Sequence, residues 1–207
     1  MRRVLIGLFG LGATLFLSGA AMRVYAQINQ AQTESRLLAD RPESAAKLAL
    51  GTASFTRADG IPTRLAIPAL GLWNSLEGVT MKINGDWSVS DAGWHISSGR
   101  PGQGVNVVLA GHSPSRDPQI WAHSVFRQLA YLRPGDEIEI RAGSHTYTYA
   151  VSNVFAIPGS EAASAAATVW LQPGTSDRLT LITCWPPHTA AYRVIVVAQP
   201  LKERSED

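Results

Sequence analysis

From Thr63 onward the chain consists of short runs rich in β-branched and aromatic residues, and this pattern restricts the fold more than any other feature of the sequence. Gly, Pro and Asp separate the runs, and little helical pattern interrupts them. The runs are RLAIPAL, LEGV, DWSVS, NVVLAGH, DEIEIRA, HTYTYAVSNVFAI, RLTLITCW and YRVIVVAQ. They predict an all-β barrel or sandwich over residues 63–201, followed by a polar tail over residues 202–207.

The N-terminal 26 residues differ from the rest of the chain in hydropathy. Val4 to Met22 are 19 consecutive uncharged residues, preceded by Arg2 and Arg3 and followed by Arg23. As a helix, this segment reaches about 28 Å, close to the thickness of the hydrocarbon core of a bilayer. We therefore expect residues 1–26 to be a membrane anchor; the alternative is a signal peptide cleaved after Ala26. In either case the rest of the chain is exported.

Residues 27–62 connect the anchor to the β-rich domain. They are rich in Gln, Ala, Ser, Thr and charged residues, and Pro42 interrupts a broken helical pattern. This composition indicates a stalk or linker, with one short helix at most.

The composition argues against several kinds of site. Eighteen Lys and Arg against 16 Asp and Glu give a net charge of +2 without any basic cluster, so no nucleic-acid partner is expected. Cys184 is the single cysteine, so the chain cannot form an internal disulfide. Without close pairs of His, Asp or Glu, neither a metal nor a cofactor is expected.

Cys184, His112 and Arg193 lie at or near the ends of three predicted strands. A short loop separates Cys184 from Arg193, so these two strand ends are expected to be neighbours. Taken singly, each residue also has an ordinary structural explanation: a buried apolar thiol, a histidine bonded to a loop carbonyl, and an arginine paired with Asp177 or Glu161. Alternation places each on a face with apolar or small residues: Val108 and Ala110, then Thr180 and Ile182, then Ile195 and Val197.

The motifs around these residues resemble those of the sortases, a family of membrane-anchored cysteine transpeptidases. Residues 179–184, LTLITC, are similar to the TLxTC signature, and residues 110–112, AGH, resemble the segment that carries the catalytic histidine. Residues 125–129 and 132–138 are similar to the pattern FxxL followed by LxxGDxI, and residues 93–95 and 101–106 resemble the run before the histidine. The segments after Cys184 and after the histidine are more similar to sortase classes D to F than to the housekeeping class.

This resemblance implies an eight-stranded sortase-like barrel with short helices, preceded by a transmembrane helix. It implies that Cys184, His112 and Arg193 are the catalytic residues, and we expect Thr183 and Trp185, on either side of the cysteine, to contact the substrate. The implied partners are exported proteins with an LPxTG-like C-terminal sorting signal and an amine, from a cell-wall precursor or a pilin lysine. The implied location is the cell membrane, through Val4 to Met22, with the catalytic domain outside the cytoplasm.

The chemistry of the three residues agrees with these roles. Amide cleavage through an acyl-enzyme needs a nucleophile, a proton donor for the departing amine and donors for the oxyanion. Cys184 supplies the thiol, His112 can exchange a proton near neutral pH, and Arg193 is a permanently charged fork that suits an oxyanion. Two alternatives remain: a cysteine endopeptidase that uses water, and a non-catalytic, membrane-tethered β-barrel that binds a ligand.

Overall fold

The computed structural model describes residues 31–33, 35–36, 60–79, 90–113, 123–162 and 170–205. Residues 31–33 and 35–36 are helical and belong to a unit separate from the β-rich domain. The predicted membrane anchor, Val4 to Met22, lies outside the described residues. None of the helices in the described ranges is long and apolar enough to cross a membrane.

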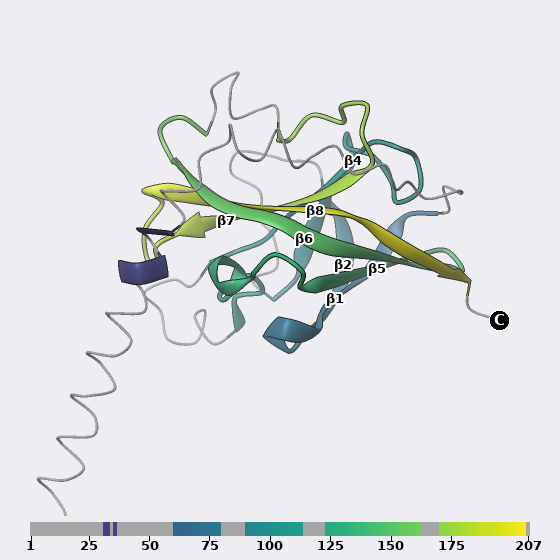
Figure 1. Ribbon diagram of the computed structural model, residues 1–207, viewed down its shortest axis with the longest axis horizontal. Coiled ribbons are helices and arrows are strands. Elements are labelled where there is room, and N and C mark those ends of the chain that lie inside the picture. The colour runs from purple at the N-terminus through teal and green to yellow at the C-terminus, as the bar shows by residue number, and fades with distance from the viewer. Residues whose placement is uncertain are drawn as a thin grey trace, which may run out of the picture. The chain divides into compact units, whose positions relative to one another are not determined.

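The described part of the second unit is an all-β domain with eight strands and two short 3-10 helices (Figure 1). The strands are β1 (Pro62–Ile67), β2 (Leu72–Val79), β3 (Ala92–His95), β4 (Asn106–Ala110), β5 (Glu137–Ala142), β6 (His145–Pro158), β7 (Arg178–Trp185) and β8 (Tyr192–Ser205). The 3-10 helices are η1 (Pro68–Leu70) and η2 (Leu129–Tyr131). The predicted all-β class is confirmed.

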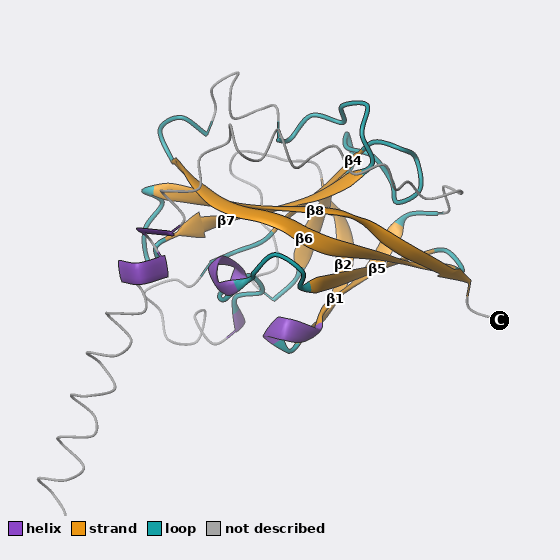
Figure 2. Ribbon diagram, viewed as in Figure 1, coloured by secondary structure: helices purple, strands orange, loops and turns teal. Residues whose placement is uncertain are grey.

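The eight strands form one strongly curled sheet in the order β1-β2-β3-β4-β7-β8-β6-β5. Strand β1 pairs with both β2 and β5, which closes the sheet into a barrel. The pairs β2–β3 and β4–β7 are parallel, and the other pairs are antiparallel. Figure 2 shows the long strands β6 and β8 running side by side along the length of the sheet.

One strand and one domain boundary differ from the predictions. Strand β3 was not among the predicted runs; its sequence AGWH has a single strong β-former, and pairing with β2 and β4 holds it in the sheet. The predicted run DWSVS lies outside the described residues except for Ser90. Strand β8 continues to Ser205, so the boundary placed after residue 201 falls within this strand.

Side chains on the two faces of the sheet pack into separate apolar clusters. We call the face that points into the barrel the inner face and the opposite one the outer face. The inner face of β4, β7 and β8 contributes to the main core with Val107, Leu109, Leu179, Leu181, Val194, Val196 and Ala198. On the outer face a smaller cluster, here called the outer cluster, consists of Phe155, Ile157, Trp170, Ile195 and Val197, with Ala162 and Ile182 packed against it. The predicted alternation along β7 and β8 is therefore confirmed.

Candidate active site

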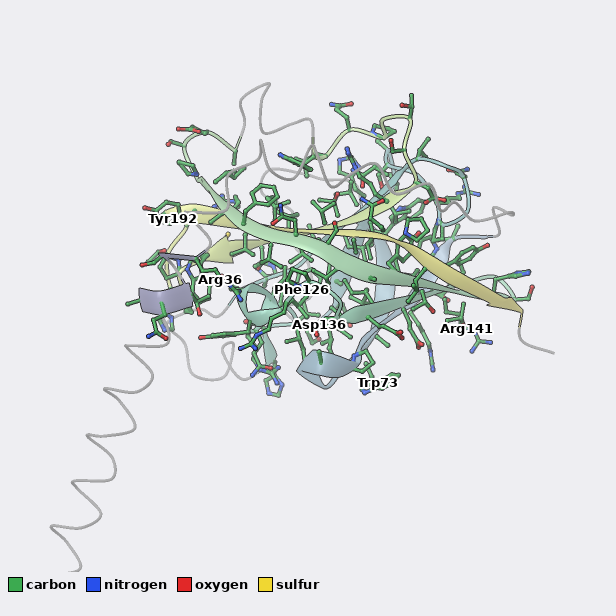
Figure 3. All side chains as sticks on the ribbon, viewed as in Figure 1. Arg36, Trp73, Phe126, Asp136, Arg141 and Tyr192 are labelled. Carbon is green, nitrogen blue, oxygen red and sulfur yellow. The ribbon has the colours of Figure 1, made fainter. Side chains whose placement is uncertain are left out.

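Cys184 and Arg193 lie directly opposite each other at the end of the β7–β8 pair. Directly opposed residues of antiparallel strands have their side chains on the same face, with Cβ atoms about 4.5 to 5.5 Å apart. Both side chains are half-buried. Tyr192, labelled in Figure 3 at the start of β8, marks this end of the barrel. The prediction that the two strand ends are neighbours is confirmed.

His112 reaches the same end of the sheet through the parallel pairing of β4 with β7. Ala110 is the register partner of Ile182, and the Gly111 N–H donates to the Ile182 carbonyl at 3.1 Å. Two residues beyond this pair, His112 is therefore level with Cys184. The His112 side chain is exposed, as expected on the outer face. Two of the three predicted catalytic residues thus lie on the adjacent strands β7 and β8, and the third lies just beyond the end of β4.

The backbone before His112 packs closely against the main core, and only glycine fits there. A Cβ atom on Gly111 would come within 2.5 Å of the Phe126 ring and 2.6 Å of Val125. Both of these side chains are buried in the main core, and Figure 3 labels Phe126 beneath β6. The Phe126 N–H also donates to the His112 carbonyl at 3.1 Å. The segment at residue 112 is thus held by β7 on one side and by the 125–126 turn on the other.

The guanidinium of Arg193 is anchored through one of its nitrogens. Nη1 donates to the carbonyls of Ala190 at 3.1 Å and Tyr192 at 3.2 Å. Within the described ranges, the structure shows no ion pair of Arg193 with Asp177 or Glu161, which the sequence left open as partners. Nε and Nη2 have no further partner among the described residues, so this side of the fork can receive a bound anion or carbonyl.

Thr183 and Trp185 lie on the inner face, on the opposite side of β7 from Cys184. Thr183 is 4% exposed, and its hydroxyl donates to the Gly111 carbonyl at 2.8 Å. Trp185 is 2% exposed and belongs to the main core, with its ring edge-on to Tyr131 at 6.2 Å between centroids. A direct contact of either side chain with substrate stays a prediction.

Asn106 organises the outer face near the other end of β4, and the sequence reasoning did not single it out. Its side chain is fully buried and donates to the carbonyls of Trp170 at 2.8 Å and Gln172 at 3.0 Å. Its Oδ1 accepts the Thr180 hydroxyl at 2.9 Å. The sequence feature that could have identified Asn106 is its place as a polar residue in the apolar run NVVLA, because a buried amide must be hydrogen-bonded.

These bonds hold Trp170 in place on the outer cluster. The Trp170 ring packs edge-on against Phe155, with centroids 5.0 Å apart, and the Arg178 guanidinium lies 5.6 Å from the Trp170 ring. Burial lowers the pKa of Arg178 from its usual value. On the outer face, the half-buried Ile182 beside Cys184 thus packs against this buried apolar cluster.

The described residues do not present a metal-ligand cluster. No group of three His, Cys, Asp or Glu side chains within these ranges could hold a metal ion. The ring of His95 bonds to the backbone of Ser97 at 3.2 Å, and the ring of His145 lies 3.1 Å from the Ser144 hydroxyl. These two histidines have local structural partners, and neither lies opposite Cys184 in the strand pairing.

A sequence model of the sortase domain matches residues 65–201 of this chain. The protein belongs to the sortase family. The resemblance found in the motifs is therefore confirmed, and membership of this family implies cysteine transpeptidase activity. No match was found among curated proteins.

Solved sortase structures show the same fold. Sortase A from Listeria monocytogenes is 23% identical with a TM-score of 0.57, covering 72% of this chain and 92% of that one. Sortase E1 from Streptomyces coelicolor is 24% identical with a TM-score of 0.54, covering 74% and 94%. Sortase C-1 from Actinomyces oris is 21% identical with a TM-score of 0.54, covering 78% and 82%. Similar scores for three classes leave the expected class D to F affiliation a prediction.

Proposed function

We propose that this sortase is a membrane-anchored transpeptidase that cleaves an LPxTG-like C-terminal sorting signal of an exported protein and transfers the acyl group to an amine. The observation that carries this proposal is the register that brings three residues together. Cys184 and Arg193 are cross-strand partners, and the parallel β4–β7 ladder places His112 level with the cysteine. A nucleophile, a proton donor and an oxyanion ligand are the groups that acyl transfer needs.

In the acylation half-reaction, the Cys184 sulfur attacks the scissile carbonyl of the sorting signal. The carbonyl oxygen becomes an oxyanion, and the charged fork of Arg193 stabilises it through the nitrogens that the Ala190 and Tyr192 carbonyls do not occupy. His112 donates its proton to the departing amine as the C–N bond breaks. The product is a thioester between Cys184 and the N-terminal fragment of the substrate.

In the second half-reaction, an acceptor amine attacks the thioester carbonyl. His112, now neutral, takes a proton from the amine, and the Cys184 thiolate leaves. Arg193 stabilises the second oxyanion at the same position. Water as acceptor would give hydrolysis instead, so the nature of the acceptor separates a transpeptidase from an endopeptidase.

We place the sorting-signal peptide over the outer face beside Cys184. Ile182, two residues before Cys184 on this face, is half-buried and offers an apolar contact that suits the apolar side chains of an LPxTG-like segment. The structure of sortase E1 from Streptomyces coelicolor contains a tripeptide in its active site, which supports a peptide ligand here.

The proposal is tested with the full-length chain in detergent, incubated with pooled LPxTG-like peptides and an excess of a small amine. Mass spectrometry of the products distinguishes the three functions left open by the sequence. A peptide–amine adduct supports the transpeptidase, a hydrolysed peptide with no adduct indicates an endopeptidase, and intact peptide indicates a binding protein. Trapping the thioester on Cys184 in cells would identify the natural signal from the mass of the attached peptide.

We further propose that Val4 to Met22 remains as a single membrane span with the catalytic domain outside the cytoplasm. Nine of these residues are Val, Leu, Ile or Phe, and they supply about −3 to −5 kcal/mol for insertion. Tethering to the membrane raises the effective concentration of membrane-held substrates. Cell fractionation with sequencing of the mature N-terminus tests this: soluble protein that starts at Gln27 would overturn the anchor and leave the catalytic proposal intact.

A further inference from the structure

Thr183 is one residue before the nucleophile, yet its side chain points to the other face of β7. Cys184 is half-buried on the outer face, whereas Thr183 is 4% exposed and faces the barrel interior. Its hydroxyl donates to the Gly111 carbonyl at 2.8 Å. A peptide bound over the outer face meets Cys184 and Ile182, and the strand backbone separates it from the Thr183 hydroxyl.

This bond joins the strand of the nucleophile to the segment of the histidine. Gly111 immediately precedes His112, and β4 ends at Ala110, so regular strand pairing stops just before the histidine. Beyond that point the Gly111 N–H donates to the Ile182 carbonyl at 3.1 Å, and the Thr183 hydroxyl donates to the Gly111 carbonyl at 2.8 Å, and both bonds connect the segment to β7. Of these two hydrogen bonds, only the one donated by Thr183 involves a side chain.

The packing around Gly111 makes the position of His112 sensitive to this bond. On the core side, Phe126 and Val125 leave no space for even a Cβ atom, and the Phe126 N–H holds the His112 carbonyl. The segment is therefore confined between the 125–126 turn and β7. The Gly111 N–H and the Thr183 hydroxyl both hold it against β7.

We infer that Thr183 is a positioning residue, whose hydroxyl holds the Gly111 carbonyl and thereby keeps His112 in register with Cys184. This inference rests on the proposed function, because the reaction in which Thr183 would position His112 is the proposed acyl transfer. Because proton transfer and thiol attack need reacting atoms in a narrow geometry, a displacement of about 1 Å can cost about 10²-fold in rate. Loss of the hydroxyl should therefore lower kcat and leave peptide binding unchanged.

The test compares Thr183→Val, which keeps the shape of the side chain and removes the hydroxyl, with Thr183→Ser, which keeps the hydroxyl. Ser152→Ala is the matched control, since the Ser152 hydroxyl makes the same kind of bond, to the Val197 carbonyl at 2.9 Å, between β6 and β8. Each full-length variant is assayed for kcat and KM with peptide and amine. Thermal melting of each variant reports the fraction that is folded.

A second measurement does not require peptide turnover. The rate at which iodoacetamide alkylates Cys184 is followed from pH 5 to 9 in wild type, His112→Ala and the two Thr183 variants. This pH–rate profile reports the influence of the imidazole on the thiol, which a purely structural role of Thr183 would not change. If the chain turns over no peptide, the proposed function fails while this measurement still decides the role of Thr183.

We expect Thr183→Val to lower kcat by about 10-fold to 10²-fold with KM within about twofold, and to shift the alkylation profile toward that of His112→Ala. Thr183→Ser and Ser152→Ala should stay within about threefold of wild type. The inference is overturned if Thr183→Val keeps wild-type kcat and profile, or raises KM alone, or if Thr183→Ser is equally impaired. It is also overturned if His112→Ala leaves the profile unchanged. Should Thr183→Val fail to fold, Thr183→Ala takes its place in the same comparison.

Discussion

The inner and outer faces of β7 and β8 belong to the same two strands but have different roles. On the inner face Leu179, Leu181, Val194 and Val196 are fully buried in the main core. On the outer face the same two strands present Ile182, Cys184 and Arg193, all half-buried, beside the outer cluster. Consecutive residues along each strand therefore alternate between the main core and the outer face that carries the candidate active site.

This difference shows how a small barrel can carry an active site without weakening its core. Stability comes mainly from the inner positions, where each fully buried aliphatic side chain contributes about 1.5 to 3 kcal/mol through removal from water. The outer positions can hold a thiol and a guanidinium because they do not fill the interior. Substitutions one residue apart should then affect different properties, and four predictions test this separation.

The largest effect is expected for Cys184→Ala on the outer face. Cleavage and transfer should be abolished, because no other thiol is present in the chain to form the acyl-enzyme. The free energy of unfolding should change little, since the sulfur is half-buried and outside the main core. Product formation is measured by mass spectrometry and stability by urea denaturation; turnover by the folded variant would contradict the assignment. Cys184→Ser is expected to be nearly as inactive.

Arg193→Lys should have the next largest effect, again on activity. Lysine keeps the charge but not the planar fork, so it cannot hold the Ala190 and Tyr192 carbonyls and an oxyanion in the same geometry. We expect kcat to fall by roughly 10²-fold, in line with about 2.7 to 4 kcal/mol for one oxyanion donor. Steady-state kinetics with peptide and amine measure it. Activity within about threefold of wild type would mean that charge alone is sufficient.

A matched pair on β7 compares the two faces directly. Leu181→Ala on the inner face should lower the free energy of unfolding by about 2 to 5 kcal/mol, with kcat per folded molecule unchanged. Ile182→Ala on the outer face should cost less stability, because Ile182 is only half-buried, and should raise KM for the peptide. Urea denaturation and steady-state kinetics measure both variants. The separation of faces fails if the two variants have the same pattern of effects.

Local sequence patterns predicted much of this arrangement. Period-2 alternation indicated that Cys184 and Arg193 each share a face with apolar neighbours, and the short loop indicated that they meet; the β7–β8 register confirms both. The position of His112 could not be derived in this way. It depends on parallel pairing between β4 and β7, which are separated by more than sixty residues, so only the family resemblance pointed to it.

Other features of the site needed three-dimensional packing. The role of Gly111 depends on the rings and methyl groups of Phe126 and Val125, which a sequence cannot place. Trp185 lies in the main core, on the opposite face of β7 from Cys184, and its expected contact with substrate stays a prediction. Asn106 acts through the carbonyls of Trp170 and Gln172, more than sixty residues away in the chain.

The smallest effect is expected on stability at high pH, from a titratable side chain in the main core. Burial, and to a lesser degree the charges of Asp177 and Tyr147, raise the pKa of Tyr149 well above its usual value near 10. The folded chain therefore keeps the phenol proton at a pH where the unfolded chain releases it. The stability due to this group is complete below about pH 10 and falls above it, by up to about 1.4 kcal/mol per pH unit. Tyr149→Phe should match wild type at pH 8 within about 1 kcal/mol and lose less stability between pH 10 and 11, as measured by urea denaturation. Tyr131→Phe is the control, because the Tyr131 side chain is 42% exposed. If wild type and Tyr149→Phe lose the same free energy of unfolding between pH 10 and 11, the idea that the inner face excludes a charged side chain is wrong.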